Sequence, residues 1–481
     1  MPTPEPRPGD LGRVHILGIG GSGQSGLARL MLDRGIAVSG SDVRDAARMR
    51  SLASEGVKVY VGHDAAHLGS GRESADTVIV TSVIAEDNPE LVEARDRGLR
   101  ILTRAQGLAI MIAGSRIVGI SGTHGKTTTT SMITVCLNKC GADPSFAIGS
   151  EVHDLGSNAH TGSSDLFIVE ADESDGAFML MDPVAVAVTN VEPDHMNFWG
   201  TFDALEAAFD DFVALPAKND GFSVVWCDEP ASRALAARAT DKGVNVLTYG
   251  ESPDADYRVK ILGSERAGYK FNVSREGESL GDVTLRVPGR HNALNATAAL
   301  AICDGLGYDT SVVMRGLSEY AGARRRFEFK GEAGGVRVYD DFAHHPTAVH
   351  ATLAAAREFV GSGRVIVAFQ PLHYYRVAMF GREFGQALGL ADELVILEVC
   401  GAGEEPIPGA SGQSLVAKVP LPAGHVVFEP SWSNAPERLA SLVRPGDIIM
   451  TVGPEDVALL GPEVLALLRE RQEAQPGRDP R

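Results

Sequence analysis

The sequence has few of the features that mark membrane, secreted or disulfide-stabilised proteins. No apolar run approaches the roughly 20 residues that a membrane-spanning helix needs, so we expect no insertion into a membrane. The 5 cysteines are scattered and odd in number, which is typical of a reduced, cytoplasmic protein. The proline-rich start, MPTPEPRPGD, lacks the apolar core of a signal peptide and is predicted to be a loose leader.

Positive charge is also scarce. The 481 residues include 44 lysines and arginines against 63 acidic residues, which gives a formal net charge of −19. Such an acidic chain is not expected to bind nucleic acid or an anionic membrane surface. Any bound phosphate must therefore meet a local cluster of cations. The expected partners are small molecules. We expect a monomer or a weak homodimer.

A glycine-rich loop and a lysine follow a short apolar strand at residues 116–120, where residues 119–131 read GISGTHGKTTTTS. In such a loop backbone N–H groups can surround phosphate oxygens, Lys126 can reach the β- and γ-phosphates, and Thr127 can hold Mg²⁺. The spacing departs from the strict Walker pattern, because Ile120 stands where a glycine is usual. An ordinary glycine turn is the alternative. Threonines in a row after a lysine favour a nucleotide site, because they are poor helix formers unless a ligand binds there.

A second glycine loop, Gly18-Ile19-Gly20-Gly21-Ser22-Gly23, fits GxGxxG between a predicted strand and a predicted helix. Asp42 ends the next strand, where an acid commonly meets a ribose hydroxyl. NAD is the default interpretation, but any nucleotide with a diphosphate would fit this loop. No redox partner for a nicotinamide is evident. A glycine turn packed only on its own helix is the structural alternative.

Carboxylates follow two further apolar strands. Residues 170–175 read EADESD after one strand, and Asp194 and His195 follow the next. Because the carboxyl ends of parallel strands meet at one edge of a sheet, these groups are expected near the phosphate loop. Oxygen ligands there suit Mg²⁺ that bridges phosphate oxygens. For His195 alone, a solvated surface position is the alternative.

Two further groups of polar residues lie towards the C-terminus. Asn292 and Asn295 are expected on one helical face, where they could meet an adenine ring or a phosphate, although N-capping also suits Asn292. Arg326 ends a basic run and is placed to clamp a γ-phosphate, with a plain basic linker as the alternative. His344 and His345 follow a pair of aspartates at a strand end.

Apolar strands alternate with helical stretches almost throughout, which predicts an α/β fold with parallel sheets. We expect a Rossmann-like domain at residues 1–113, a central P-loop-type ATPase α/β domain at 114–322 and a second Rossmann-like domain at 323–481, of which about 470–481 are disordered. Residues 251–287 are predicted to form short antiparallel strands at the edge of the central domain. The main predicted strands are 13–18, 36–39, 57–61, 77–80, 116–120, 166–169, 183–189, 336–339, 364–369, 393–397 and 447–451, and two predicted helices are 292–303 and 311–321.

Together these motifs resemble the Mur ligases, the ATP-dependent amide-forming enzymes of peptidoglycan precursor synthesis. The resemblance extends from about Val14 to about Leu468 and is carried by HILGIGGSGQSG, GTHGKTTTTSM, VEADESD, TNVEPDHMNFWG, GRHNALNATAA, RRRFEFKG, YDDFAHHPTAV, FQP and AGEEPIPGASG. The last motif is most similar to family members that join L-alanine to UDP-N-acetylmuramate. The resemblance implies a cytoplasmic ligase of cell wall biogenesis, with a role in cell shape and division. It would use ATP and Mg²⁺, activate the carboxylate as an acyl phosphate, and release ADP and phosphate.

The resemblance also implies roles for individual residues. Catalytic residues would be Lys126, Arg326, Asp341 and His344. ATP would be bound by Gly122, Thr123, His124, Gly125, Lys126, Thr127, Thr128, Asn292, Asn295 and Arg326. The metal ligands would be Thr127, Glu170 and His195. The UDP substrate would be bound by Gly20, Gly21, Ser22, Gly23, Asp42, His63, Ser82 and Arg104, and the amino acid by His344, His345 and Arg376.

The sequence departs from the alanine-adding pattern in three places. Ala348 stands where those members have a glutamate, FQPLHYYRV replaces FQPHRYSRT or FQPHLYSRT, and Asn197-Phe198-Trp199 replaces Asp-Phe-Tyr. The first change resembles the ligase that attaches a recycled tripeptide to UDP-N-acetylmuramate, which is the alternative function. That ligase lacks the FQP and AGEEPIPGASG segments. A more distant alternative is a dehydrogenase-like binding protein with NAD in the first loop and ATP as an effector.

Overall fold

The computed structural model describes residues 8–81, 84–265 and 268–473. The first seven residues of the predicted leader, Ser82, and the end of the predicted tail lie outside these ranges. The chain divides into two compact units. One unit contains residues 1–260, 271–283 and 294–320, and the other contains 261–270, 284–293 and 321–481.

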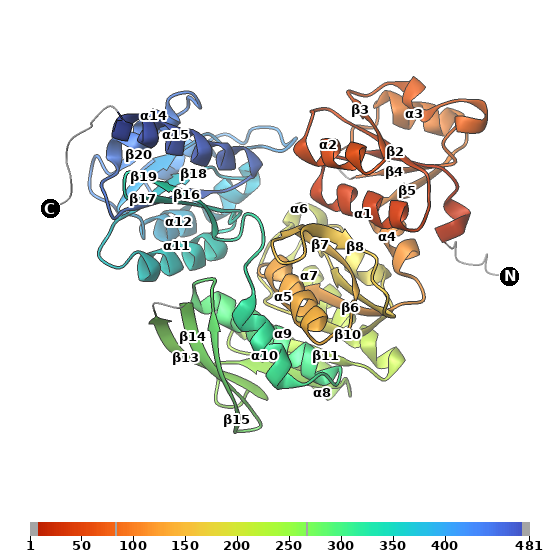
Figure 1. Cartoon of the computed structure of the whole chain (residues 1–481), viewed down its shortest axis with the longest axis horizontal. Helices are drawn as coiled ribbons and strands as arrows, with labels where there is room; N and C mark the ends of the chain where they lie inside the picture. The colour runs from red at the N-terminus through yellow and green to blue at the C-terminus, as the bar shows by residue number, and fades with distance from the viewer. Residues whose placement is uncertain (1–7, 82–83, 266–267, 474–481) are drawn as a thin grey trace. The chain divides into compact units, whose positions relative to one another are not determined.

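The first unit begins with a five-stranded parallel sheet of order β3-β2-β1-β4-β5 (Figure 1). Its strands are β1 (Val14–Leu17), β2 (Val38–Asp42), β3 (Lys58–Val61), β4 (Thr77–Val80) and β5 (Arg100–Thr103). Its helices are η1 (Pro8–Leu11), α1 (Ser22–Asp33), α2 (Ala47–Ser54), η2 (Ala65–Leu68), η3 (Gly71–Glu73), α3 (Pro89–Asp96) and α4 (Arg104–Ile112). The strand order reverses between β1 and β4, and open α/β sheets bind ligands at such a point.

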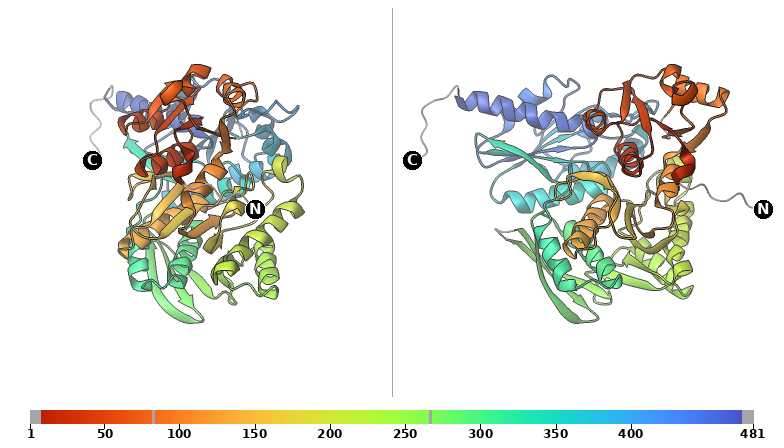
Figure 2. Two further views of the ribbon diagram at one scale, coloured as in Figure 1. Left: turned by 90° about the vertical axis from the view of Figure 1, so that its right-hand side faces the viewer. Right: turned by 45° about the vertical axis from the view of Figure 1, so that its right-hand side comes forward.

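A second sheet contains ten strands in the order β15-β14-β13-β12-β11-β10-β6-β9-β7-β8. The strands are β6 (Arg116–Ser121), β7 (Ser145–Val152), β8 (Ser157–His160), β9 (Leu166–Glu170), β10 (Pro183–Val188), β11 (Phe222–Trp226), β12 (Val246–Gly250), β13 (Tyr257–Glu265), β14 (Gly268–Arg275) and β15 (Glu278–Leu285). β6 lies between β10 and β9 and is parallel to both. The carboxyl ends of these three strands therefore meet at one edge. The long strands β13 to β15, green in Figures 1 and 2, form one end of the sheet.

Helices follow the strands of this sheet. They are α5 (Lys126–Lys139), η4 (Ala177–Leu180), α6 (Met196–Trp199), α7 (Phe202–Ala214), η5 (Leu215–Asn219), α8 (Pro230–Asp241), α9 (Arg290–Gly305) and α10 (Thr310–Glu319). Five of the six residues of β6 are buried, and Ile117 to Ile120 form an uninterrupted stretch without polar side chains, as expected for a strand covered on both faces. Thr201 caps α7 by accepting the N–H of Ala204, so that helix begins where its sequence supplies a cap.

The second unit contains a six-stranded sheet of order β16-β17-β21-β18-β19-β20. Its elements are β16 (Glu328–Ala333), β17 (Val336–Asp341), α11 (Pro346–Val360), β18 (Val365–Phe369), α12 (Tyr374–Leu388), β19 (Glu393–Ile396), α13 (Gly412–Val416), β20 (Val426–Phe428), α14 (Ala435–Leu442), β21 (Ile448–Val452), η6 (Glu455–Leu459) and α15 (Leu460–Glu473). Only the β16–β17 pair is antiparallel among the strand pairs that the structure describes here. Successive residues of β18 alternate between two cores: Val367 packs with α11 and α12, and Ile366 packs with α14 and α15.

The predicted α/β class with parallel sheets is confirmed, and each predicted strand named above overlaps an observed one. The helix predicted at 292–303 begins earlier, at Arg290. Asn292 is therefore inside the first turn, and the N-capping interpretation is wrong. α15 continues to Glu473, so residues 470–473, which were predicted to be disordered, are helical. No helix within the described ranges is long and apolar enough to cross a membrane.

Candidate active site

The glycine-rich loop joins β6 to α5 in a backbone conformation that glycine favours. Gly122 and Gly125 have φ angles of 124° and 84°. A Cβ atom at Gly122 would lie 2.2 Å from Oγ1 of Thr189, and one at Gly125 would lie 2.6 Å from Oδ1 of Asn295. The loop thus fits closely against the segment after β10 and against α9. Because Gly125 is the N-cap of α5, the positive end of this helix faces the loop, as anion sites require.

Lys126 lies over this loop as part of a buried ion pair. Its Nζ donates to the carbonyl of Gly122 at 2.7 Å and to Oε1 of Glu173 at 2.8 Å. The side chains of Lys126 and Glu173 are 13% and 2% exposed. The hydroxyl of Ser121 donates to the other oxygen of Glu173 at 3.4 Å. Sequence analysis found Lys126 but missed Glu173, which lies in the same EADESD segment as Glu170.

The charges of this pair are coupled. Burial raises the pKa of Glu173 to about 7, and the nearby Asp172 acts in the same direction while Lys126 opposes it. Burial alone would lower the pKa of Lys126, but the charges of Glu173 and Asp172 outweigh burial and raise it. The site therefore keeps the lysine charged, as a phosphate-binding group must be.

Thr127 and Glu170 meet beside Lys126, as the sequence predicts. Thr127 Oγ1 lies 3.0 Å and 3.2 Å from the two carboxylate oxygens of Glu170. The N–H of Gly149, in β7, donates to the same carboxylate at 2.8 Å, and a Cβ atom at this glycine would lie 2.7 Å from the carboxylate. A hydroxyl and a carboxylate in contact are a donor set of the kind that Mg²⁺ prefers. Thr128, the next residue of α5, is buried.

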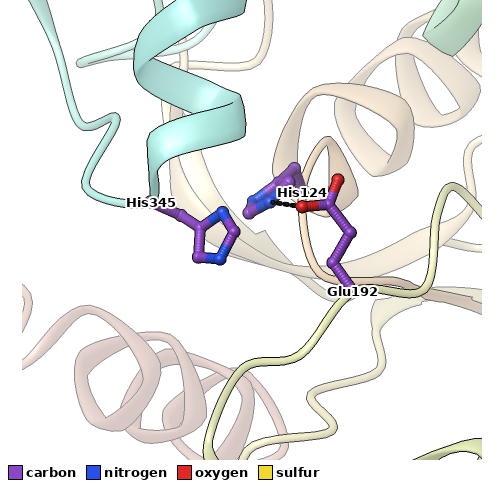
Figure 3. Close-up of side chains that lie close together, drawn as sticks. All are labelled: His124, Glu192 and His345. Atoms are coloured by element: carbon purple, nitrogen blue, oxygen red, sulfur yellow. Dashed lines mark ion pairs between the residues drawn. The ribbon is translucent and has the colours of Figure 1, made fainter. Parts of the chain in front are cut away.

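The segment after β10 holds the phosphate loop from the other side. Oδ1 of Asn190 accepts the N–H of His124 at 2.8 Å, and its Nδ2 donates to the carbonyl of His124 at 3.0 Å. The N–H of Glu192 donates to Thr123 Oγ1 at 2.9 Å. Nε2 of His124 lies 3.8 Å from a carboxylate oxygen of Glu192, an ion pair drawn in Figure 3. These contacts fix the loop conformation, and sequence analysis missed Asn190 and Glu192 as its partners.

His195 lies at the same edge of the sheet in an unusual backbone conformation. Its φ is 55°, and it is the residue before α6. Its Nε2 lies 3.6 Å from a carboxylate oxygen of the buried Asp194. Burial would raise the pKa of Asp172, but Lys126, Arg104 and then His195 lower it overall. His195 therefore belongs to the same charged group as the carboxylates after β9.

Arg104 connects the first glycine loop to these carboxylates. Its Nη2 lies 3.5 Å from Oδ2 of Asp172. A Cβ atom at Gly23 would lie 3.0 Å from Cδ of Arg104, so the arginine stem packs closely against this glycine. A small pocket lies here, and Arg104, Glu170 and Asp172 contribute its charged lining. A cation and two carboxylates thus line one small pocket whose other walls are apolar.

The first glycine loop follows β1 and is held by Asp42, the last residue of the neighbouring strand β2. Oδ2 of Asp42 accepts the N–H of Gly20 at 3.0 Å. Gly21 is the N-cap of α1, and Ser22 is the first residue of this helix. Nδ1 of His63 lies 2.8 Å from a carboxylate oxygen of the buried Glu90, a residue that sequence analysis did not select. Ser82 lies outside the described residues.

In the second unit, Asp341 and His344 are held by backbone groups. Asp341 accepts the N–H groups of Phe327 and Ala343, both at 2.8 Å, and its burial raises its pKa although Arg326 opposes this. Nδ1 of His344 donates to the carbonyl of Phe342 at 2.7 Å, so Nδ1 carries a proton.

Of the three arginines before Phe327, the middle one has a structural partner. Nε of Arg325 donates to Oδ2 of the fully buried Asp340 at 2.8 Å. The guanidinium of Arg326 lies 5.6 Å from the centre of the Phe342 ring. The two neighbouring aspartates thus differ in their surroundings. Asp340 forms an ion pair with Arg325, whereas Asp341 is the residue that the sequence predicted to be catalytic.

Glu404 joins the atypical segment FQPLHYYRV to the AGEEPIPGASG segment. Its Oε2 accepts the N–H of Tyr374 at 2.8 Å, and its Oε1 lies 3.0 Å from Nδ1 of His373. Glu404 belongs to AGEEPIPGASG, and His373 to FQPLHYYRV, where its φ is 68°. Arg376, in the first turn of α12, is buried, and His345, the N-cap of α11, is also buried.

The two predicted asparagines differ in their surroundings. Oδ1 of Asn295 lies beside Gly125 in the phosphate loop, as the geometry of a substituted Gly125 shows. Asn292 donates from Nδ2 to the carbonyl of Pro288 at 2.7 Å, one turn earlier. Within the first unit, Asn295 is thus brought to the predicted nucleotide site.

Comparison with family models matches most of the chain. Residues 13–116 match the model "Mur ligase family, catalytic domain", residues 120–303 match "Mur ligase middle domain", and residues 325–454 match "Mur ligase, glutamate ligase domain". The matches follow one another along the chain without overlap.

Curated proteins match over nearly the whole length. The chain is 53% identical over 462 residues to the UDP-N-acetylmuramate–L-alanine ligase of Acidothermus cellulolyticus, with 96% of each chain covered. It is 49% identical to the protein of the same name from Kineococcus radiotolerans, with 96% of this chain and 97% of the relative covered. The crystal structure of the UDP-N-acetylmuramate-alanine ligase from Thermotoga maritima matches with a TM-score of 0.79 and 26% identity, covering 96% of this chain and all of the other. A murein peptide ligase from Psychrobacter arcticus, 24% identical with a TM-score of 0.73, shares the fold and covers 95% of this chain and 98% of its own.

Proposed function

The chain belongs to the Mur ligase family, and we propose that it joins L-alanine to the carboxylate of UDP-N-acetylmuramate with the use of ATP. The products are UDP-N-acetylmuramoyl-L-alanine, ADP and phosphate. The names of relatives at 53% and 49% identity support alanine rather than a recycled tripeptide as the amine. The reaction belongs to cytoplasmic synthesis of the cell wall precursor. We expect small-molecule substrates and a monomer or weak homodimer.

The reaction brings the substrate carboxylate against the γ-phosphate of ATP, and these two anions repel each other. Cations at the site would reduce this repulsion. The carboxylate attacks the γ-phosphorus of ATP, the bond from this phosphorus to the bridging oxygen breaks, and ADP leaves with the electron pair. The amine of alanine then attacks the acyl phosphate, loses a proton, and displaces phosphate. We propose that Lys126 stabilises the charge that builds up on the transferred group, and its position over the glycine loop supports this role. Arg326 is the second cation that we propose for this role.

Thr127, Glu170 and His195 are the residues that we propose to hold Mg²⁺. The contact between the Thr127 hydroxyl and the Glu170 carboxylate supports the assignment, because these are oxygen donors already in contact. His195 belongs to the charged group around Asp172. A bound Mg²⁺ would neutralise phosphate charge. The residues themselves orient the donors, with Gly149 fixing the Glu170 carboxylate.

ATP is proposed to bind the loop Gly122–Thr128 with Asn292, Asn295 and Arg326. The close approach of Asn295 to Gly125 supports this placement for the asparagine. Contacts that hold the loop from the β10 side keep its N–H groups in place before a ligand arrives.

The UDP part of the substrate is proposed to bind the first glycine loop. Gly20, Gly21, Ser22, Gly23, Asp42, His63, Ser82 and Arg104 are the proposed contacts. The contact of Arg104 with Asp172 supports a position for this arginine between the proposed UDP and ATP sites.

The amino acid is proposed to meet His344, His345 and Arg376, with Asp341 as a catalytic group. The corresponding domains are proposed at residues 1–113, 114–322 and 323–481. The described part of the last range forms one sheet with its own two cores, which supports this boundary.

The observation that carries the proposal is the ion pair of Lys126, at the start of α5, with the buried Glu173, beside the Thr127–Glu170 contact. The test is phosphate release from ATP with UDP-N-acetylmuramate, Mg²⁺ and either L-alanine or the tripeptide. Release that depends on both the UDP substrate and L-alanine supports the proposal. Release with the tripeptide alone identifies the recycling ligase, and no release with either amine contradicts both.

A further inference from the structure

Glu90, in the first turn of α3, is a fully buried carboxylate that the proposed reaction does not use. Its Oε2 lies 2.8 Å from Nδ1 of His63 and 2.5 Å from Oγ of Ser41. Its Oε1 lies 2.7 Å from Nδ1 of His67. Nε2 of His15 lies 3.5 Å from the same oxygen. A buried charge needs hydrogen-bonding or oppositely charged partners. Here they come from β1, β2, the loop after β3 and η2.

The protonation of this cluster follows from the contacts. Burial raises the pKa of Glu90, but His15, Ser41 and His67 outweigh burial and lower it to about 2. Near neutral pH the carboxylate is therefore ionised and can only accept hydrogen bonds. Nδ1 of His63 and Nδ1 of His67 must then each carry a proton. In a neutral imidazole the other nitrogen, Nε2, is a hydrogen-bond acceptor.

The cluster lies directly against the first glycine loop. The carbonyl of Ser41 accepts the N–H groups of Gly18 and Ile19 at 2.8 and 3.1 Å, and the Ser41 hydroxyl donates to Glu90. The N–H of Gly62, next to His63, donates to the carbonyl of Asp42 at 2.8 Å. The same two strand ends thus hold both the loop and the histidines.

Both histidines remain partly open. The side chains of His63 and His67 are 14% and 18% exposed. The ring of Tyr60 stacks on His67 with 4.0 Å between ring centres, which restricts its rotation. In the part of the chain that the structure describes, both rings make their hydrogen bonds through Nδ1. Nε2 is thus the nitrogen available to a ligand.

We propose that Glu90 is a positioning residue of the UDP-substrate site, which holds His63 and His67 as Nδ1–H tautomers that offer Nε2 acceptors to the nucleoside. The inference rests on the proposed function, which places UDP at the first glycine loop. An acceptor pairs with a donor such as the N3–H of uracil or a ribose hydroxyl, and not with a phosphate oxygen. The histidines therefore serve the nucleoside half of UDP, and the loop N–H groups with Arg104 serve the diphosphate.

The tautomer is measured on the unaltered protein. Nitrogen-15 NMR of the histidine side chains at neutral pH distinguishes a protonated Nδ1 from a protonated Nε2, and His63→Gln and His67→Gln spectra provide the assignments. We expect the Nδ1–H form for both residues. The Nε2–H form at either residue overturns the inference. This measurement needs no Glu90 variant, so it decides the matter even if such a variant does not fold.

The functional test uses UDP as the probe in titration calorimetry. Glu90→Gln keeps the shape but presents an amide N–H₂ to one of the donors, so one ring must turn or change tautomer. We expect UDP affinity to fall by about tenfold or more, in line with an unsatisfied buried polar group. The KM for ATP should remain unchanged, which a general loss of structure would not allow. Glu93→Gln is the matched control, because Glu93 lies on the same helix, pairs with Arg97 and is 33% exposed.

The outcomes separate the inference from the proposed function. If the unaltered protein does not bind UDP, the proposed function itself fails. If it binds UDP and folded Glu90→Gln binds equally well, only the role of Glu90 is overturned. Weaker UDP binding with an unchanged KM for ATP, and no change in Glu93→Gln, supports the inference.

Discussion

Nζ of Lys126 lies 2.8 Å from Oε1 of Glu173, and both side chains are largely withdrawn from solvent. The lysine comes from the start of α5, and the glutamate follows β9, the strand next to β6 in the sheet. A charged amine held in a fixed position by a carboxylate is ready to meet a phosphate without further ordering. This preorganisation is the main electrostatic feature of the site.

Lys126→Ala should abolish most turnover and leave the UDP substrate bound. Loss of a preorganised cation that contacts the transferred group should lower kcat by at least about a hundredfold. The UDP site lies on another sheet, so the dissociation constant of UDP should stay within about twofold of the original value. Steady-state kinetics and UDP calorimetry measure the two effects. Lys139→Ala, at the exposed far end of α5, is the control. Joint loss of turnover and UDP binding would refute the division of sites.

The ion pair also predicts a pH dependence of stability. The pKa of Glu173 is raised from 4.5 to about 7 by burial, so the native state holds a proton that the unfolded state has released. The contribution of this group to stability is therefore greatest below about 4.5, falls as pH rises to about 7, and is constant above. Relative to Glu173→Gln, the thermal midpoint of the unaltered protein should fall across this window. Parallel curves for the two proteins would show that Glu173 is ionised throughout.

Glu170→Gln should weaken the use of Mg²⁺. The amide keeps a neutral oxygen for the Gly149 N–H but loses the negative charge that attracts a divalent cation. The Mg²⁺ concentration for half-maximal phosphate release should rise by about tenfold or more. Glu278→Gln, an exposed glutamate on β15, should leave the curve unchanged. An unchanged Mg²⁺ requirement in Glu170→Gln would remove this residue from the metal site.

Glu404→Gln should impair alanine use without affecting ATP use. The Glu404 carboxylate accepts from the N-terminus of α12, the helix that carries Arg376, and loss of this charge-assisted bond should loosen that helix. We expect the KM for L-alanine to rise by roughly tenfold. Glu405→Gln changes the exposed neighbour and serves as the control. A KM for alanine equal to that of the control would show that FQPLHYYRV and AGEEPIPGASG act independently.

Local patterns in the sequence were sufficient for the strands and the phosphate loop. β6 was predicted because apolar residues occupy it continuously, and the loop was predicted because glycines and a lysine follow it directly. The predicted start of α9 was two residues too late. Gly289, at φ 106°, lets the helix begin at Arg290, before Asn292, the residue that resembled an N-cap.

Partners distant in the chain could not be predicted from the sequence. Glu173 is 47 residues from Lys126, and the two meet only because β9 pairs with β6. Glu90 is 27 residues from His63, and it is a helix residue without any motif of its own. In both cases the strand order brings the pair together, and no local periodicity encodes that order.

The most direct test of the account follows oxygen from substrate to product. UDP-N-acetylmuramate labelled with oxygen-18 in its carboxylate is incubated with ATP, Mg²⁺ and L-alanine, and the released phosphate is analysed by mass. Activation as an acyl phosphate predicts one labelled oxygen in each phosphate molecule. Phosphate without the label would contradict the account, because the carboxylate oxygen would then never have been bonded to phosphorus.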